Sequence, residues 1–157
     1  MTSSVLFVCL GNICRSPSAH GVFRELVREA GLTERVLMDS AGTADWHQGK
    51  APDPRSIVAA AARGIDIADL RARQVTNEDF VRFDRILAMD EQNLADLRAR
   101  CPEAHQHKLG LFLELTPDSP VREVPDPYYG GDQGFQQVLD LIEAASRSLL
   151  EALRQKD

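Results

Sequence analysis

Cys9 and Arg15 are the two residues of this sequence whose types and spacing favour chemistry on an anion. An apolar run over residues 5–8 is short enough for a buried strand and stops at Cys9. Ser16 and Pro17 are typical of a helix start, where proline suits the first helical position and serine can cap the following N–H groups. The residues in between must therefore turn sharply, so that their backbone N–H groups and the positive end of the helix face one concavity.

A phosphate group would bind in this concavity between a nucleophile and a clamp. We expect the thiol at its base to be ionised at neutral pH, because N–H groups, a helix N-terminus and a guanidinium all face it. The guanidinium offers paired donors that match two oxygens of a phosphate. Gly11 permits close backbone approach, Asn12 tolerates a left-handed conformation, and Ser16 can donate a hydrogen bond to the sulfur. The predicted phosphate-binding residues are Leu10, Gly11, Asn12, Ile13, Cys14, Arg15 and Ser16.

Two motifs resemble those of one enzyme family. The run from Cys9 to Pro17, CLGNICRSP, is similar to the phosphate loop of the low-molecular-weight protein tyrosine phosphatases. The run from Asp126 to Tyr129, DPYY, resembles the acid loop of that family. The resemblance implies hydrolysis of phosphotyrosine in proteins, and of aryl phosphates, through a phosphocysteine intermediate, with no metal and no cofactor. The segment over residues 101–122 matches no part of the family that we can place.

The remaining candidate residues depend more on this resemblance. Asp126 would donate a proton to the departing oxygen and then activate water, although an Asp-Pro pair is also a common turn opener. Aromatic walls for the substrate are expected from Trp46, Tyr128 and Tyr129, although Trp46 could equally cover the core. In the manner of the family, Ser40 would orient Asn12, although it could merely end the predicted strand. Cys14 is either inert or, as the resemblance implies, able to form a disulfide with Cys9 that protects it from over-oxidation.

Two other functions fit parts of the pattern. An arsenate reductase of similar fold would need a relay of cysteines, for which only Cys14 and Cys101 are available. A phosphate-binding module would bind the anion without turnover. His105 and His107 lie near Cys101, but no second cysteine stands at ligand spacing, so we predict no metal site.

Composition bounds the remaining possibilities. A chain of 157 residues predicts one domain over 1–157, and 24 acidic against 18 basic residues give a net charge of −6. This balance argues against nucleic-acid or membrane-surface partners, and the short apolar run at the N-terminus is neither a signal nor a membrane span. Three cysteines are too few for a disulfide scaffold. We expect a cytoplasmic protein, for which a weak homo-oligomer is possible, and the resemblance implies tyrosine-phosphorylated proteins as its substrates.

The predicted elements alternate between strands and helices. The apolar spacing predicts strands over residues 5–8, 36–41, 85–89 and 109–113, and helices over 19–30, 54–63, 76–83, 90–100 and from 132 onward. Residues 43–53 and 101–108 are expected to be irregular. The fold class is therefore a single three-layer α/β domain, in which a four-stranded parallel sheet has helices on both faces and the phosphate loop follows the first strand. Ligands of such sheets bind beyond the carboxyl ends of the strands.

Overall fold

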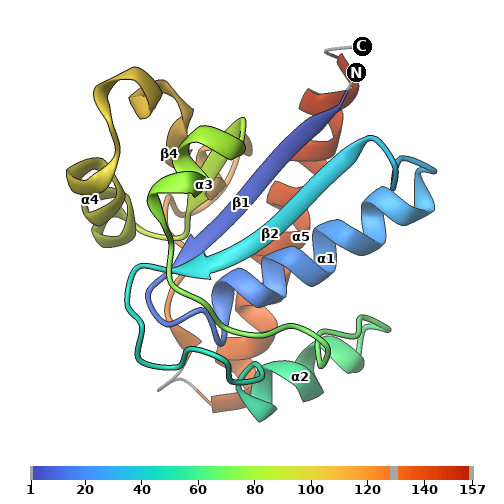
Figure 1. Ribbon diagram of the computed structural model, residues 1–157. Helices are drawn as coiled ribbons and strands as arrows, with labels where there is room; N and C mark the ends of the chain where they lie inside the picture. The colour runs from blue at the N-terminus through green and yellow to red at the C-terminus, as the bar shows by residue number, and fades with distance from the viewer. Residues whose placement is uncertain (1, 128–130, 156–157) are drawn as a thin grey trace.

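A four-stranded parallel sheet forms the centre of the computed structural model, which describes residues 2–127 and 131–155 (Figure 1). The strands are paired in the order β2-β1-β3-β4. Their bounds are Ser3–Cys9 for β1, Val36–Gly42 for β2, Arg85–Ala88 for β3 and Leu109–Leu111 for β4. The strand order reverses between β1 and β3, which is where sheets of this kind bind their ligands.

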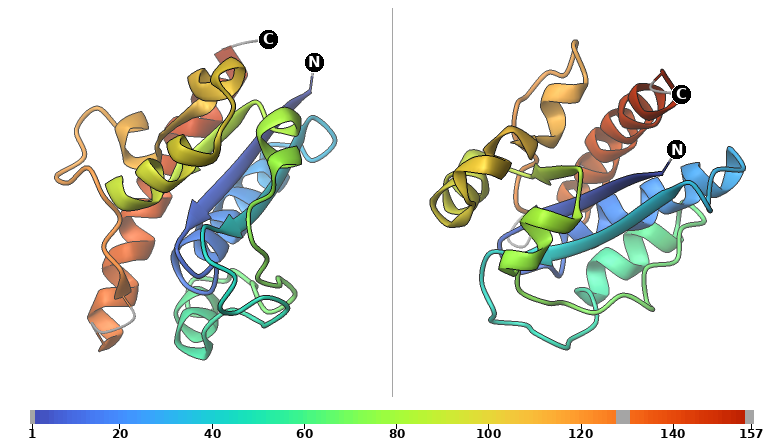
Figure 2. Two further views of the ribbon diagram at one scale, coloured as in Figure 1. Left: turned by 60° about the vertical axis from the view of Figure 1, so that its left-hand side comes forward. Right: turned by 45° about the horizontal axis from the view of Figure 1, so that its top comes forward.

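Helices cover both faces of the sheet, as Figures 1 and 2 show. One face carries α1 (Arg15–Glu29), α2 (Pro54–Ala61) and α5 (Gly131–Gln155). The other face carries α3 (Asn77–Arg82) and α4 (Glu91–Arg100). The predicted three-layer α/β fold is thus confirmed. Over the described residues, none of the helices is both long and apolar enough to cross a bilayer.

Strand β1 is buried on both faces because its side chains alternate between two hydrophobic clusters. Val5 and Phe7 pack into the cluster that includes α1 and α5, and Leu6 and Val8 pack into the cluster that includes α3 and α4. All four are 0% exposed. The rings of Phe7 and Phe23 meet edge to face at 5.8 Å, which ties β1 to α1. The strand that precedes the phosphate loop is therefore held from both sides.

Several predicted boundaries differ from the structure. Helix α1 begins at Arg15, so Pro17 is its third residue and not its first. The expected capping by Ser16 is wrong, because the residue before the helix is Cys14, which makes no side-chain cap, and the serine hydroxyl faces the sulfur of Cys9 instead. Strand β4 ends two residues early because residues 112–115 wind into a 3-10 helix. A second 3-10 helix, over 103–108, replaces most of the irregular segment expected there.

Gly21 in α1 offers a test of how tightly this helix packs. A Cβ at this position would lie 2.3 Å from Cγ2 of Ile67, a side chain that is itself 0% exposed. Helix propensity alone favours alanine by about 1 kcal/mol, whereas overpacking a core costs about 1–3 kcal/mol, and an approach this close to a buried methyl group belongs in the upper part of that range, at about 2–3 kcal/mol. We expect Gly21→Ala to lower the free energy of unfolding by about 1–2 kcal/mol, measured by urea denaturation.

The matched control is Gly134→Ala in α5. There the nearest atoms to an added Cβ lie 3.9 Å away, an ordinary contact distance. Propensity should then prevail, and the control should be neutral or stabilising by up to about 1 kcal/mol. A Gly21→Ala protein as stable as the parent would contradict the packing argument.

Candidate active site

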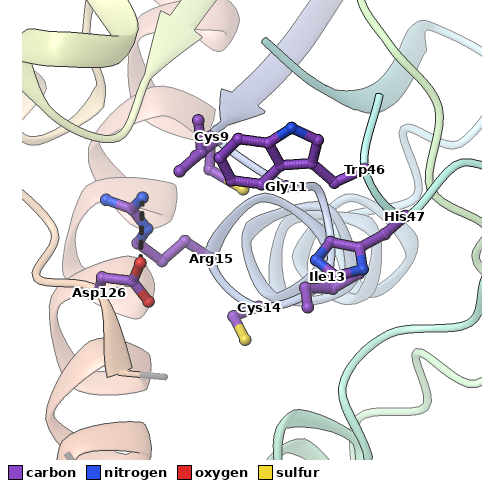
Figure 3. A pocket seen from close by; sticks show the side chains of 9 residues that line it. Cys9, Gly11, Ile13, Cys14, Arg15, Trp46, His47 and Asp126 are labelled. Carbon is purple, nitrogen blue, oxygen red and sulfur yellow. Dashed lines mark ion pairs between the residues drawn. The ribbon is translucent and has the colours of Figure 1, made fainter. Parts of the chain in front are cut away.

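A cavity of about 240 Å³ opens beyond the carboxyl end of β1, and residues from distant parts of the chain line it. Figure 3 shows these side chains converging from the loop after β1, from the loop after β2 and from the segment before α5. The lining residues are Cys9, Leu10, Gly11, Ile13, Cys14, Arg15, Trp46, His47 and Asp126. Asn12 and Ser16 lie behind this lining and act on it through hydrogen bonds.

The sulfur of Cys9 faces hydrogen-bond donors. Its Sγ lies 3.0 Å from Oγ of Ser16 and accepts a hydrogen bond of 3.3 Å from the backbone N–H of Asn12. Asn12 has φ +58°, the left-handed conformation expected for it, and this turns its N–H back toward the sulfur. Donors in such positions stabilise a negatively charged sulfur.

The backbone carbonyls of the phosphate loop, residues 9–16, are tied to groups outside it. The carbonyl oxygens of Cys9 and Leu10 accept hydrogen bonds from residues 43 and 44, at 2.9 and 3.0 Å. The carbonyl of Ile13 accepts one of 2.8 Å from residue 53. These three carbonyls therefore point away from the cavity, where they would repel an anion.

Arg15 is held by Asp90, which the sequence placed only at the start of the predicted helix over residues 90–100. Its Nη1 donates to Oδ2 of Asp90 at 2.6 Å and to the carbonyl of Val124 at 3.0 Å. Burial would lower the pKa of Arg15, but the nearby Cys9 and Asp90 outweigh it and raise that pKa. The guanidinium, only 4% exposed, therefore stays charged and fixed at the wall of the cavity.

Asp126 lies next to this arginine. Its Oδ2 is 3.9 Å from Nη2 of Arg15, and its side chain is 46% exposed at the cavity (Figure 3). Two residues earlier, Val124 donates its N–H to the carbonyl of Met89, the residue after β3, at 2.8 Å. The structure thus ties the segment that carries Asp126 to both the sheet and the arginine. Tyr128 and Tyr129, the other predicted wall residues, lie outside the described residues.

Trp46 and His47 form the opposite wall. Trp46 is 66% exposed and lines the cavity. Of the two roles that the sequence left open for it, a wall for the substrate therefore fits better than cover for the core. His47 packs against the phosphate loop, because a Cβ added to Gly11 would lie 2.9 Å from its Cδ2. A side chain at position 11 would therefore displace this imidazole from the loop.

Cys14 is a buried thiol at the edge of the cavity. Burial raises its pKa to about 12, against a hydrogen bond to Ser56 that would lower it. The thiol is therefore neutral at physiological pH, which sets it apart from a nucleophile. Cys9, Cys14 and Cys101 are all free thiols in this structure.

The hydrogen bonds to Asn12 that were expected from Ser40 come from other residues. Its hydroxyl lies 3.4 Å from Nδ1 of His20, whereas the amide of Asn12 is held by Ser16 at 2.7 Å and by the backbone N–H of Arg73 at 3.0 Å. His20 is itself buried, and burial lowers its pKa to about 4. Ser40 therefore contacts a neutral imidazole behind the loop.

With the geometry in hand, comparisons identify the class of protein. A family model described as low molecular weight phosphotyrosine protein phosphatase matches residues 4–157. The protein of that name from Sus scrofa is 42% identical over 156 residues and covers 98% of each chain. The low molecular weight protein-tyrosine-phosphatase of Streptomyces coelicolor is 45% identical over 159 residues, covering 99% of this chain and 96% of that protein. The crystal structure of a protein tyrosine phosphatase from Entamoeba histolytica superimposes with a TM-score of 0.95 at 41% identity, over 99% of both chains.

These matches place the chain among the protein tyrosine phosphatases, which are hydrolases. Within that class it belongs to the low molecular weight phosphotyrosine protein phosphatase family. The resemblance found in the sequence is thereby confirmed, and an arsenate reductase is not favoured. Cys101, which that alternative would need, packs with the hydrophobic cluster of α3 and α4.

Sequence reasoning missed four residues that shape the site. Asp90 and Val124 hold Arg15, His47 forms part of the wall, and Arg73 holds Asn12. Asp90 had a usable signal, since it follows a predicted strand and so lies at the same sheet edge as Cys9. Within residues 2–127 and 131–155, no group of three or more histidine, cysteine or acidic side chains could hold a metal ion.

The buried His20 predicts a pH dependence of stability. Its pKa is about 4 in the folded chain and 6.5 for a histidine free in water, so between these values the unfolded chain binds more protons. The contribution of the His20 imidazole to the free energy of unfolding is therefore present above pH 6.5 and lost as the pH falls toward 4. We expect the free energy of unfolding to drop by about 3 kcal/mol over this window, measured by urea denaturation at several pH values.

The control is His20→Gln, which keeps a polar partner for Ser40 and removes the titrating ring. Between pH 6.5 and 4, the free energy of unfolding of this variant should fall by about 3 kcal/mol less than that of the parent. Parallel pH curves for the parent and this variant would show that the imidazole is not buried as described.

Proposed function

We propose that the protein hydrolyses phosphotyrosine in protein substrates through a phosphocysteine intermediate. Cys9 is the nucleophile, Arg15 binds and stabilises the phosphoryl group, and Asp126 is the general acid. The observation that carries this proposal is that thiol, guanidinium and carboxylate line one cavity, although they come from two parts of the chain more than 100 residues apart. Membership of the family supports the reaction class, and the geometry of the cavity supports the proposed roles.

In the first step, the sulfur attacks phosphorus and the bond to the tyrosine oxygen breaks. The transition state spreads its negative charge over three phosphoryl oxygens. The N–H groups of the phosphate loop and the fixed guanidinium of Arg15 face that charge, so they stabilise it without reorganising. Asp126, at the open side of the cavity, donates its proton to the phenolate oxygen as it leaves.

In the second step, water replaces sulfur on phosphorus. Asp126, now ionised, takes a proton from the attacking water, and the bond between sulfur and phosphorus breaks to release phosphate and the thiolate. Ser16, whose Oγ lies 3.0 Å from the sulfur, can donate a hydrogen bond to the leaving thiolate and so stabilise its charge. The same hydroxyl accepts a hydrogen bond from the Asn12 amide, which orients it for this role.

The walls of the cavity favour a flat leaving group. The indole of Trp46 and the ring of His47 stand on one side, and Leu10 and Ile13 add apolar surface. Tyr128 and Tyr129 remain predicted members of this wall.

We place the phosphatase domain at 1–157 and the protein in the cytoplasm, where a free thiol nucleophile stays reduced. The net charge of −6 supports protein substrates over nucleic acid or membrane surfaces, and a weak homo-oligomer remains compatible with this proposal.

Replacing the nucleophile tests the covalent step. We expect Cys9→Ser to lower kcat on an aryl phosphate by about a thousandfold or more, since a neutral hydroxyl replaces the thiolate. The readout is release of the phenol under steady-state conditions, together with mass spectrometry of parent protein quenched during turnover. The parent should carry an added phosphoryl group, and the variant should not.

The control is Cys101→Ser, a buried thiol far from the cavity, which should retain phosphatase activity. Retained turnover in Cys9→Ser would remove this cysteine from the mechanism. Arsenate reduction that disappears in Cys101→Ser would instead support the reductase.

Replacing Asp126 tests the general acid. We expect Asp126→Asn to lower kcat/KM for phenyl phosphate, a poor leaving group, by about 10²–10⁴-fold, because an amide cannot protonate the departing oxygen. p-Nitrophenyl phosphate needs little protonation and should lose much less. Asp118→Asn, in an exposed turn of the preceding loop, is the control and should match the parent on both substrates. Equal losses on the two substrates in Asp126→Asn would rule out this role.

A further inference from the structure

The segment over residues 72–75 lies beside the end of β2 and extends its hydrogen bonding. The N–H of Gly42 donates to the carbonyl of Arg73 at 2.8 Å, and the N–H of Val75 donates back to the carbonyl of Gly42 at 2.8 Å. Gln74 adds a side-chain hydrogen bond of 3.1 Å to the carbonyl of Thr43. This segment is therefore fixed to the sheet edge from which the cavity opens.

On one side, the 72–75 segment holds the phosphate loop. The backbone N–H of Arg73 donates to Oδ1 of Asn12 at 3.0 Å, and the amide nitrogen of Asn12 donates to Ser16 at 2.7 Å. Ser16 lies 3.0 Å from the sulfur of Cys9. Asn12 and Ser16 are 3% and 0% exposed, so water does not compete for these bonds. An unbroken chain of hydrogen bonds thus joins Arg73 to the nucleophile.

On the other side, the same segment holds the wall of the cavity. The N–H of Gly49 donates to the carbonyl of Ala72 at 2.7 Å, and the N–H of Ala72 donates to the carbonyl of Lys50 at 2.8 Å. These bonds close the loop that presents Trp46 and His47. The position of the 72–75 segment therefore bears on both the nucleophile and the substrate wall.

The side chain of Arg73 fixes the segment in this position. Its two terminal nitrogens each donate to an oxygen of Asp79 at 2.9 Å, and its Nε donates to Asp39 at 3.0 Å. Asp79 is 3% exposed and forms a capping box with Thr76 at the start of α3. Asp39 belongs to β2. Burial would raise the pKa of Asp79, but hydrogen bonds from Arg73 and Thr76 outweigh it and lower that pKa. The guanidinium is clamped between helix and strand.

We propose that Arg73 is a positioning residue of the phosphatase reaction, whose clamped side chain aims its own backbone N–H at Asn12 and so holds the nucleophile and its hydrogen-bond donors in place. The inference rests on the proposed role of Cys9. A lysine can occupy the same volume, but one ammonium cannot serve the paired oxygens of Asp79 and the carboxylate of Asp39 in the same planar arrangement.

The test is kcat and KM of Arg73→Lys on p-nitrophenyl phosphate. We expect kcat to fall by about 10–100-fold while KM changes by less than about threefold, because a displaced donor set affects the transition state more than ground-state binding. The variant should be assayed well below its own melting temperature. A purely structural role would lower that temperature and leave kcat of the folded protein unchanged.

A double-mutant cycle with Asn12→Ala tests the route of the effect. Asn12→Ala removes the acceptor for the Arg73 N–H, so Arg73→Lys should cost less than about twofold in kcat in that background. Arg63→Lys is the matched control, because Arg63 also bridges two acids, Asp140 and Glu143, away from the cavity. Its kcat should equal that of the parent.

The outcomes separate this inference from the proposed function. A parent-like kcat in Arg73→Lys, or losses that multiply in the double variant, would overturn the positioning role even with Cys9→Ser inactive. An active Cys9→Ser protein would overturn the proposed function itself.

Should Arg73→Lys fail to fold, Asp39→Asn replaces it, because it weakens the clamp and keeps an acceptor for the N–H of Ser40. The same loss of kcat, again abolished by Asn12→Ala, supports the inference, and a parent-like kcat overturns it.

Discussion

The sharp turn between β1 and α1 is the constraint on which the rest of the structure depends. Six residues after the strand ends, the chain must bring a guanidinium back to the thiol it has just left. This turn requires Asn12 at φ +58°, a conformation that costs about 1 kcal/mol or more for a residue with a side chain. The hydrogen bonds of its amide to Ser16 and Arg73 offset that cost, so the strained residue also connects the loop to the protein behind it.

The parallel sheet explains why so many distant residues meet at this turn. Each strand ends at the same edge, so the loops after β1, β2 and β3 come together there. Asp90 follows β3 and caps α4 through Oδ1, while its Oδ2 holds Arg15. Val124 continues the pattern, because it forms hydrogen bonds with Met89, the residue after β3, and with the same guanidinium. One arginine therefore connects the phosphate loop to the segment that carries Asp126.

How far the sequence predicts this structure depends on the range of each interaction. The strands, the main helices and the phosphate loop follow from neighbouring residues, and their predictions hold to within a few positions. Contacts such as Arg15 with Asp90, or Arg73 with Asn12, join residues 75 and 61 positions apart, and no local pattern encodes them. Ser16 shows the same limit. Its capping preference is local, but its hydroxyl is taken by Cys9 and Asn12, which only the folded loop brings to it.

The clamp of Arg73 illustrates why a buried ion pair need not be explained by stability. Removing two charges from water costs several kcal/mol each, and well-packed apolar residues of similar volume often fold as stably. Such residues could not fix one backbone N–H against Asn12 with the directionality of three hydrogen bonds on a planar group. Asp79 also anchors α3 and Asp39 lies in β2, so the clamp fixes the segment relative to two elements at once. In the role we propose, its contribution is to geometry, because a sulfur displaced by a fraction of an ångström loses the donors that make it a nucleophile.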